Sequence, residues 1–174
     1  MISNTPWNLF HWKTVKLPNR PQLGAPFSVR PASYDEKEMV KQVALLSLKM
    51  NTEWHDATII ATNAIHEAVK RAFIDNNTPS CLLIAHGHRI IGVSILDMRP
   101  EAPCHLLSGP WVLTEYRNRG FGSALLYASL EQLANQGITE VSGITRGNTT
   151  SSRFVYSKFG GIMSLTAPPE FFSE

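Results

Sequence analysis

Residues 112–124 read VLTEYRNRGFGSA and join the end of an apolar run to a turn that holds two arginines and two glycines. Apolar residues then recur at helical spacing from Phe121 to Leu133, so a strand should end near Leu113 and a helix should begin near Gly120. The first turn of a helix leaves about four backbone N–H groups unpaired and carries partial positive charge. Glycine lets a ligand approach that backbone closely. The segment therefore predicts a binding site for phosphate or pyrophosphate.

Two well-known phosphate loops do not fit this segment. A Walker A loop ends in Gly-Lys-Ser/Thr, whereas Gly122 is followed by serine, and the dinucleotide fingerprint G-x-G-x-x-G would need glycine at Leu125. The segment instead resembles R/Q-x-x-G-x-G/A at Arg117, Gly120 and Gly122. That pattern is the pyrophosphate loop of the GNAT family of acetyl-CoA-dependent N-acetyltransferases. The preceding residues also look like the V-x-P-x-x lead-in of the family, with Thr114 in place of proline.

A second segment strengthens the resemblance. Residues 148–161 read NTTSSRFVYSKFGG and are similar to the N-x-x-A-x-x-x-Y-x-K-x-G-F helix of the same family. Tyr156 and Lys158 match this pattern without a gap, and its asparagine position then falls on Thr149, one residue after Asn148. Which of these two side chains meets the cofactor stays open. Because both motifs occur in the order and separation typical of the family, cofactor binding is favoured over a simple tight turn.

The rest of the sequence is compatible with the element order of that family. Apolar periodicity predicts strands at 27–30, 81–85, 90–96, 105–113, 138–145 and 161–166, and helices at 34–49, 56–73, 120–136 and 149–159. The resemblance implies an α/β fold with a central mixed, mostly antiparallel sheet of about six strands, flanked by helices on both faces. The implied order is β-α-α-β-β-β-α-β-α-β.

The two ends of the chain depart from the family pattern. Residues 1–26 contain four prolines and three aromatic residues, so we expect an irregular extension that packs on the body, with the N-acetyltransferase domain at residues 27–174. The family closes its sheet with a seventh strand, whereas the last expected strand here is followed only by the proline-containing residues 167–174. The aromatic extension or a partner subunit should cover the sheet edge that this leaves open.

The resemblance also implies where the site lies. In the family the sheet splays between its fourth and fifth strands, here residues 105–113 and 139–145, the pantetheine arm of acetyl-CoA lies in the gap, and the amine enters from the opposite side. The implied cofactor contacts are Trp111, Val112, Leu113, Arg117, Asn118, Arg119, Gly120, Phe121, Gly122, Ser123, Asn148 and Ser152. Tyr156 is implied as the catalytic acid that protonates the departing CoA thiolate, with a packed core aromatic as the simpler alternative. Lys158 is expected to be a solvated charge.

The base that accepts the proton of the amine is not identified by the sequence. An alkylamine is only about one part in a few thousand neutral at pH 7, so some group must take its proton. The strand position at which some family members carry a carboxylate is Leu106, which cannot accept one. His105, Asp97, Glu101 and a water chain to a more distant carboxylate are the alternatives.

Two further features concern the reacting groups. Pro110 has no N–H to hold the acetyl carbonyl, so either Trp111 or Val112 supplies that donor or the strand is bulged at the Gly-Pro pair. The candidate contacts of the acceptor amine are Trp54, His55 and His105. For Trp54 and His55 a hydrophobic staple at the start of the second helix is the alternative.

Composition limits the class of function. The chain has 174 residues, enough for one domain, and 16 Lys and Arg against 14 Asp and Glu give a formal net charge of +2, too small for a protein that wraps duplex nucleic acid. The longest apolar run, residues 81–85, is far shorter than the roughly 20 residues of a membrane helix. Cys81 and Cys104 lack metal-ligand spacing and are expected to be reduced core residues. We therefore expect a cytoplasmic protein with no metal, DNA or membrane partner.

The sequence favours an N-acetyltransferase that moves the acetyl group of acetyl-CoA to a primary amine of a small molecule or peptide by direct attack. Two alternatives stay open. One is a protein or aminoacyl-tRNA N-acetyltransferase, and the other is a non-catalytic, CoA-binding regulatory module. Whether the chain forms a homodimer is left open as well.

Overall fold

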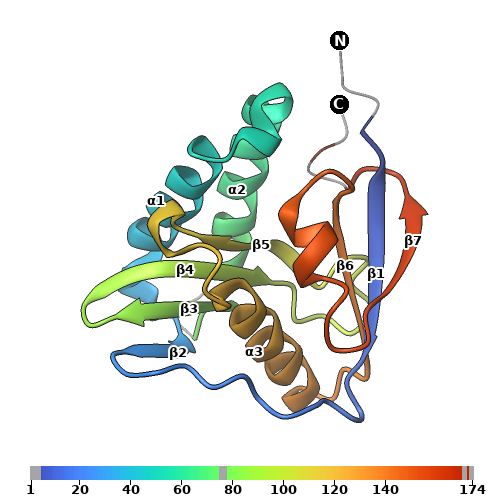
Figure 1. Cartoon of the computed structure of the whole chain (residues 1–174), viewed down its shortest axis with the longest axis horizontal. Coiled ribbons are helices and arrows are strands. Elements are labelled where there is room, and N and C mark those ends of the chain that lie inside the picture. Colours follow the sequence, from blue (N-terminus) through green and yellow to red (C-terminus); the bar gives the residue numbers. More distant parts are fainter. Residues whose placement is uncertain (1–4, 75–77, 170–171, 173–174) are drawn as a thin grey trace.

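Figure 1 shows the computed structural model of the chain, which describes residues 5–74, 78–169 and 172. The strands are β1 (Trp7–Lys13), β2 (Phe27–Pro31), β3 (Cys81–His86), β4 (Arg89–Leu96), β5 (Leu106–Val112), β6 (Glu140–Arg146) and β7 (Ile162–Thr166). The α-helices are α1 (Lys37–Lys49), α2 (Thr58–Ala72) and α3 (Phe121–Asn135). The short helical segments are η1 (Tyr34–Glu36), η2 (Thr52–Ala57), η3 (Thr114–Tyr116) and the π-helical turn η4 (Ser151–Val155).

All the strands belong to one sheet in the order β2-β3-β4-β5-β6-β1-β7. Every neighbouring pair is antiparallel except β5 and β6, which run parallel and pair only at Leu106 and Gly143. From that point β5 and β6 diverge, so the backbone of β5 beyond Leu106 has no ladder with β6 within the described residues. The expected mixed, mostly antiparallel sheet is confirmed.

Helices cover the two faces of this sheet. Figure 1 shows α3 against one face and α1 and α2 against the other. Side chains that alternate along the strands divide the interior accordingly, because Leu82 and Ile84 pack with α3 whereas Leu83 and Ala85 pack with α1 and α2. Each face of the sheet therefore has its own hydrophobic core.

The N-terminal segment is a strand inside the sheet, which corrects the expectation of an irregular extension and of about six strands. β1 lies between β6 and β7 and pairs antiparallel with both. The segment lacks proline between Pro6 and Pro18, and every second residue from Asn8 to Thr14 is buried, which is the period of a strand. The prolines of residues 1–26 thus all lie outside β1.

Two helix boundaries also differ from expectation. The helix expected at 149–159 is only the π-helical turn Ser151–Val155. Asp56, at the expected start of the second helix, forms an ion pair with Arg146 at the end of β6. α2 begins two residues later at Thr58, whose hydroxyl donates to the carbonyl of Trp54 at 3.0 Å. The loop before α2 is thereby tied to β6 across the splayed part of the sheet.

Both cysteines are buried and free, as expected. Burial raises the pKa of the Cys81 thiol to about 12 and that of the Cys104 thiol to about 11. Among the described residues, none of the helices has the length and apolar character needed to span a membrane, and no group of three or more His, Cys, Asp or Glu is placed to hold a metal.

Candidate functional site

A cavity of about 630 Å³ lies where β5 and β6 diverge. Its lining includes Phe121 and Tyr156 from the core next to α3, and Ile65 and Trp111 from the core next to α1 and α2. The cavity therefore reaches both faces of the sheet. Its size is in the range typical of small-molecule sites.

The loop before α3 forms one end of the cavity. Gly120 is the N-cap of α3 with φ of 84°, a left-handed conformation that favours glycine, and no side chain caps the helix. The backbone N–H groups of the first turn, Phe121 to Ser123, thus lack an intrahelical or capping partner. This arrangement suits an anion.

Arg117 holds this loop in place. Its Nε donates to the carbonyl of Val112 at 3.1 Å, and its Nη2 donates to the carbonyl of Ser47 in α1 at 2.9 Å. Burial lowers the pKa of the Arg117 guanidinium, which nevertheless stays cationic at neutral pH because the ordinary value is so high. Arg117 therefore positions the loop and adds positive charge to this end of the cavity.

Lys158 joins the same end of the cavity. Its Nζ donates to Ser123 Oγ in the first turn of α3 at 2.9 Å. The side chain is exposed, as expected of a solvated charge, and its ammonium lies at the uncapped start of α3. The neighbouring Phe159 packs against Tyr127 of α3, with ring centres 5.4 Å apart, and keeps this turn beside the helix. Lys158 belongs to the second motif, but the sequence did not indicate that its ammonium lies beside the first turn of α3.

Tyr156 lies deep in the cavity wall. Its hydroxyl donates to the carbonyl of Gly109 at 2.6 Å, and its ring meets the edges of Phe10 and Trp12 with centroid distances of 5.4 Å each. Only 2% of Tyr156 is exposed. Burial raises its pKa well above that of a free phenol, so the hydroxyl keeps its proton at neutral pH.

The strand β5, which forms part of the cavity wall, is bulged at Gly109 and Pro110. A bulge here was one of the two alternatives that the sequence left open for Pro110. The register against β4 shifts between Val93 and Ile95, opposite Gly109 and Pro110. Gly109 has φ of 97°, and a Cβ there would lie 2.8 Å from the carbonyl of Val93, so only glycine fits. The bulge turns the Gly109 carbonyl toward Tyr156.

The segment η2 lines the cavity from the side of α1 and α2. Glu53 lines it, and Glu53 Oε1 accepts hydrogen bonds from the backbone N–H of Thr150, at 2.9 Å, and from the Thr150 hydroxyl. Trp54 is buried, and the guanidinium of Arg146 lies 5.2 Å from the centre of its ring. Arg146 also pairs with Asp56 at 2.7 Å. Sequence reasoning missed Glu53, whose only signal was its place beside Trp54.

Most of the residues expected at the site line the cavity. They are Trp54, Trp111, Val112, Arg117, Asn118, Gly120, Phe121, Gly122, Ser123 and Tyr156. The others lie outside its lining. They are Leu113 in the core, Arg119 over the Tyr116 ring, Asn148 before η4, Ser152 within η4, the exposed His55 and the buried His105. The roles of the lining residues stay predictions.

The residues considered as a base lie elsewhere. His105 is buried, and its Nδ1 accepts from the backbone N–H of Ser142 at 3.0 Å. Asp97 is held by Arg99, with a shortest distance of 2.6 Å. Neither of them lines the cavity, and nor does Glu101. All three residues lie near the end of a strand. Nearness to a strand end does not determine whether a side chain points into the gap between β5 and β6.

A comparison with known protein families shows to which family this chain belongs. The model described as "Acetyltransferase (GNAT) family" matches residues 47–160, which include both motifs. The chain belongs to the GNAT acetyltransferase family. No curated protein matches it.

Solved structures share the fold of this GNAT chain at low sequence identity. A GCN5-related N-acetyltransferase from Sphaerobacter thermophilus is 14% identical with a TM-score of 0.63, covering 92% of this chain and 49% of that one. One from Ralstonia eutropha JMP134 is 17% identical with a TM-score of 0.52, covering 85% and 97%. One from Kribbella flavida is 16% identical with a TM-score of 0.57, covering 94% and 56%. The chain spans about half the length of several of the solved chains it matches.

Proposed function

We propose that this protein transfers the acetyl group of acetyl-CoA to a primary amine of a small molecule or peptide by direct nucleophilic attack. The main support for this proposal is that one cavity, where β5 and β6 diverge, reaches both faces of the sheet. Such a cavity lets a donor and an acceptor meet from opposite sides. A cytoplasmic location remains a prediction from the sequence.

The residues on the α3 side of the cavity fit the donor. The uncapped N–H groups at the start of α3 and the Lys158 ammonium would hold the pyrophosphate, and the free edge of β5 would pair with the pantetheine arm. Bound acetyl-CoA supplies an acyl thioester that an amine can attack. Tyr156, whose hydroxyl lies in the cavity wall, is the donor for the leaving thiolate, and the proton that the amine loses on attack returns Tyr156 to its neutral form.

The proposal is tested by the release of CoA from acetyl-CoA in the presence of a panel of primary amines, with mass spectrometry of the product. We expect release that requires an amine and yields one N-acetyl product per CoA. A protein that binds acetyl-CoA but releases CoA with no amine would be a non-catalytic CoA-binding module. Turnover only with a protein or an aminoacyl-tRNA would assign it to the other alternative.

Replacement of Lys158 by glutamine should weaken acetyl-CoA binding. Loss of one charge-assisted hydrogen bond to a phosphate should raise the dissociation constant about tenfold. Isothermal titration calorimetry measures this, with Lys70→Gln on the exposed side of α2 as the matched control. Binding of acetyl-pantetheine, which lacks the pyrophosphate, should not change. Equal losses for both ligands would contradict a contact between Lys158 and the pyrophosphate.

A further inference from the structure

Four aromatic rings form a cluster at the end of the cavity on the side of α1 and α2. They are Trp7, Trp54, Trp111 and Phe172, all of which line the cavity. Trp54 lies 6.1 Å from Trp7, 6.0 Å from Trp111 and 5.8 Å from Phe172, and Trp7 lies 4.9 Å from Phe172, measured between ring centres. These separations are those of interacting aromatic side chains. We call this group the ring cluster.

The ring cluster is assembled from distant parts of the chain. Trp7 begins β1, Trp54 lies in η2, Trp111 lies in β5, and Phe172 is close to the C-terminus. The ring contact between Trp7 and Phe172 brings together residues from near the two ends of the sequence. All four rings pack with the core on the α1 and α2 face, opposite the α3 face on which the donor end lies. The ring cluster therefore belongs to the acceptor end of the cavity.

Charge at the acceptor end comes from Glu53. It is the only carboxylate among the described residues that line the cavity. Thr150 holds one of its oxygens, Oε1, and so fixes the carboxylate beside Trp54. Of the two cations among the described residues that line the cavity, Lys158 is engaged with Ser123 at the donor end. Arg117 is held by backbone carbonyls and also interacts electrostatically with Glu53, so the positive charge of Arg117 offsets part of the Glu53 charge. The acceptor end thus combines apolar rings with one negative charge.

We propose that the acceptor is a primary amine that carries a flat apolar ring, such as an arylalkylamine. The inference rests on the proposed function, because it assigns the acceptor side of the same cavity. The ring of the amine packs against the ring cluster, and its ammonium faces the Glu53 carboxylate. Arg146, over the face of Trp54, does not repel the ammonium strongly because Asp56 neutralises it.

Equilibrium binding to the protein without acetyl-CoA tests the inference, measured by calorimetry with three probes. We expect 2-phenylethylamine to bind about tenfold or more tightly than propylamine, which lacks the ring, and than 2-phenylethanol, which lacks the charge. Equal binding of the ring-bearing and ring-free amines, or no binding of 2-phenylethylamine, would overturn it. This comparison uses the unaltered chain and does not depend on any variant folding.

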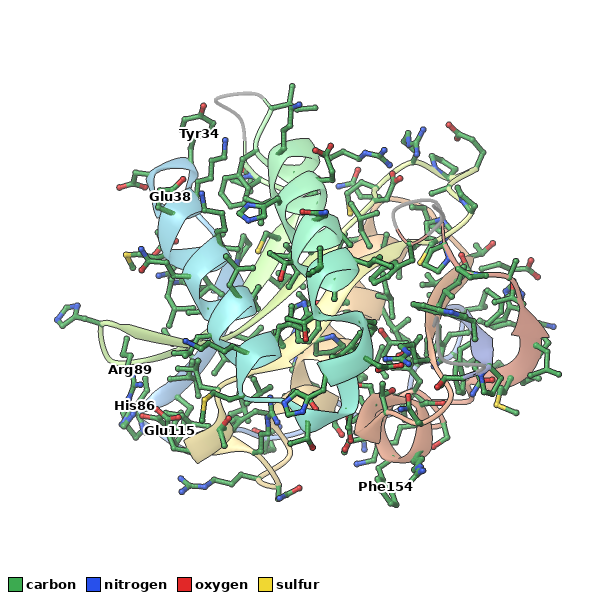
Figure 2. All side chains as sticks on the ribbon, turned by 90° about the horizontal axis from the view of Figure 1, so that it is seen from above. Tyr34, Glu38, His86, Arg89, Glu115 and Phe154 are labelled. Atoms are coloured by element: carbon green, nitrogen blue, oxygen red, sulfur yellow. The ribbon has the colours of Figure 1, made fainter. Side chains whose placement is uncertain are left out.

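Two variants assign the effect to residues. Phe172→Ala should weaken binding of 2-phenylethylamine about fivefold or more while leaving propylamine nearly unchanged. Glu53→Gln should weaken both amines and spare 2-phenylethanol. The controls are Tyr34→Ala in η1 and Glu38→Gln in α1, both far from Phe154 at the η4 side of the cavity (Figure 2). Losses equal to those of the controls would contradict the assignment.

The result also separates this inference from the proposed function. If the protein binds 2-phenylethylamine as expected but transfers no acetyl group to any amine, the proposed function fails and the ring-cluster site stands. If it acetylates propylamine and 2-phenylethylamine with equal kcat/KM, the proposed function stands and the inference fails.

Discussion

Trp12→Ala should lower the free energy of unfolding by about 3–5 kcal/mol, as is typical when a large core aromatic is truncated. Trp12 is 1% exposed, and its ring lies 6.0 Å from Phe10 and 5.4 Å from Tyr156. Its indole N–H also donates to the carbonyl of Lys158 at 3.0 Å. Trp12 thus joins β1 to the segment that carries Tyr156 and Lys158, and urea denaturation measures the loss.

The matched control is Val15→Ala, two residues after β1, where the side chain is 74% exposed. It should change the free energy of unfolding by less than about 0.5 kcal/mol. Deletion of residues 1–13 should be more severe than Trp12→Ala, because it removes β1 from between β6 and β7. A deletion that leaves the chain soluble and equally stable would show that β1 is not part of the folded sheet.

Tyr156→Phe should lower kcat of acetyl transfer about a hundredfold while KM for acetyl-CoA changes little. The phenylalanine ring keeps the packing against Phe10 and Trp12, so the loss is confined to the hydroxyl and its proton. Because burial raises the pKa of Tyr156, the unaltered enzyme should hold this proton beyond the pH of about 10 at which a free tyrosine loses it. Steady-state kinetics with purified variants measures both parameters.

A matched control separates catalysis from stability. The Tyr127 hydroxyl also donates to a backbone carbonyl, that of Pro18 at 2.7 Å, and Tyr127 is likewise buried but does not line the site cavity. Tyr127→Phe should lower the free energy of unfolding by about as much as Tyr156→Phe, because each loses one neutral hydrogen bond worth about 1 kcal/mol. Because Tyr127 does not line the cavity, kcat should stay within about twofold. Equal kcat losses in the two variants would remove Tyr156 from the mechanism.

Much of the architecture could be predicted from local patterns. The apolar run before Arg117, the glycines after it and the helical spacing beyond define the β5 to α3 connection without any tertiary information. β1 could not be placed in the same way, because its neighbours β6 and β7 lie more than a hundred residues away. A local pattern carries no information about such distant partners.

The site was predictable where its groups belong to a continuous motif. Tyr156 and the loop at Gly120 line the cavity because strand, loop and helix follow one another in the chain. Glu53 and Phe172 reach it only through tertiary packing, which no short pattern records. His105 is buried just before β5 and does not line the cavity, whereas the next residue, Leu106, does. Successive residues of a strand point to opposite faces, so a shift of one residue moves a side chain to the other face.

Initial rates of CoA release at crossed concentrations of acetyl-CoA and amine test the central claim most directly. If one cavity holds both substrates at the gap between β5 and β6, both must be bound before reaction, and double-reciprocal plots should intersect. Parallel lines would show that an acetyl group passes to the protein before the amine binds, and they would contradict direct attack across the sheet.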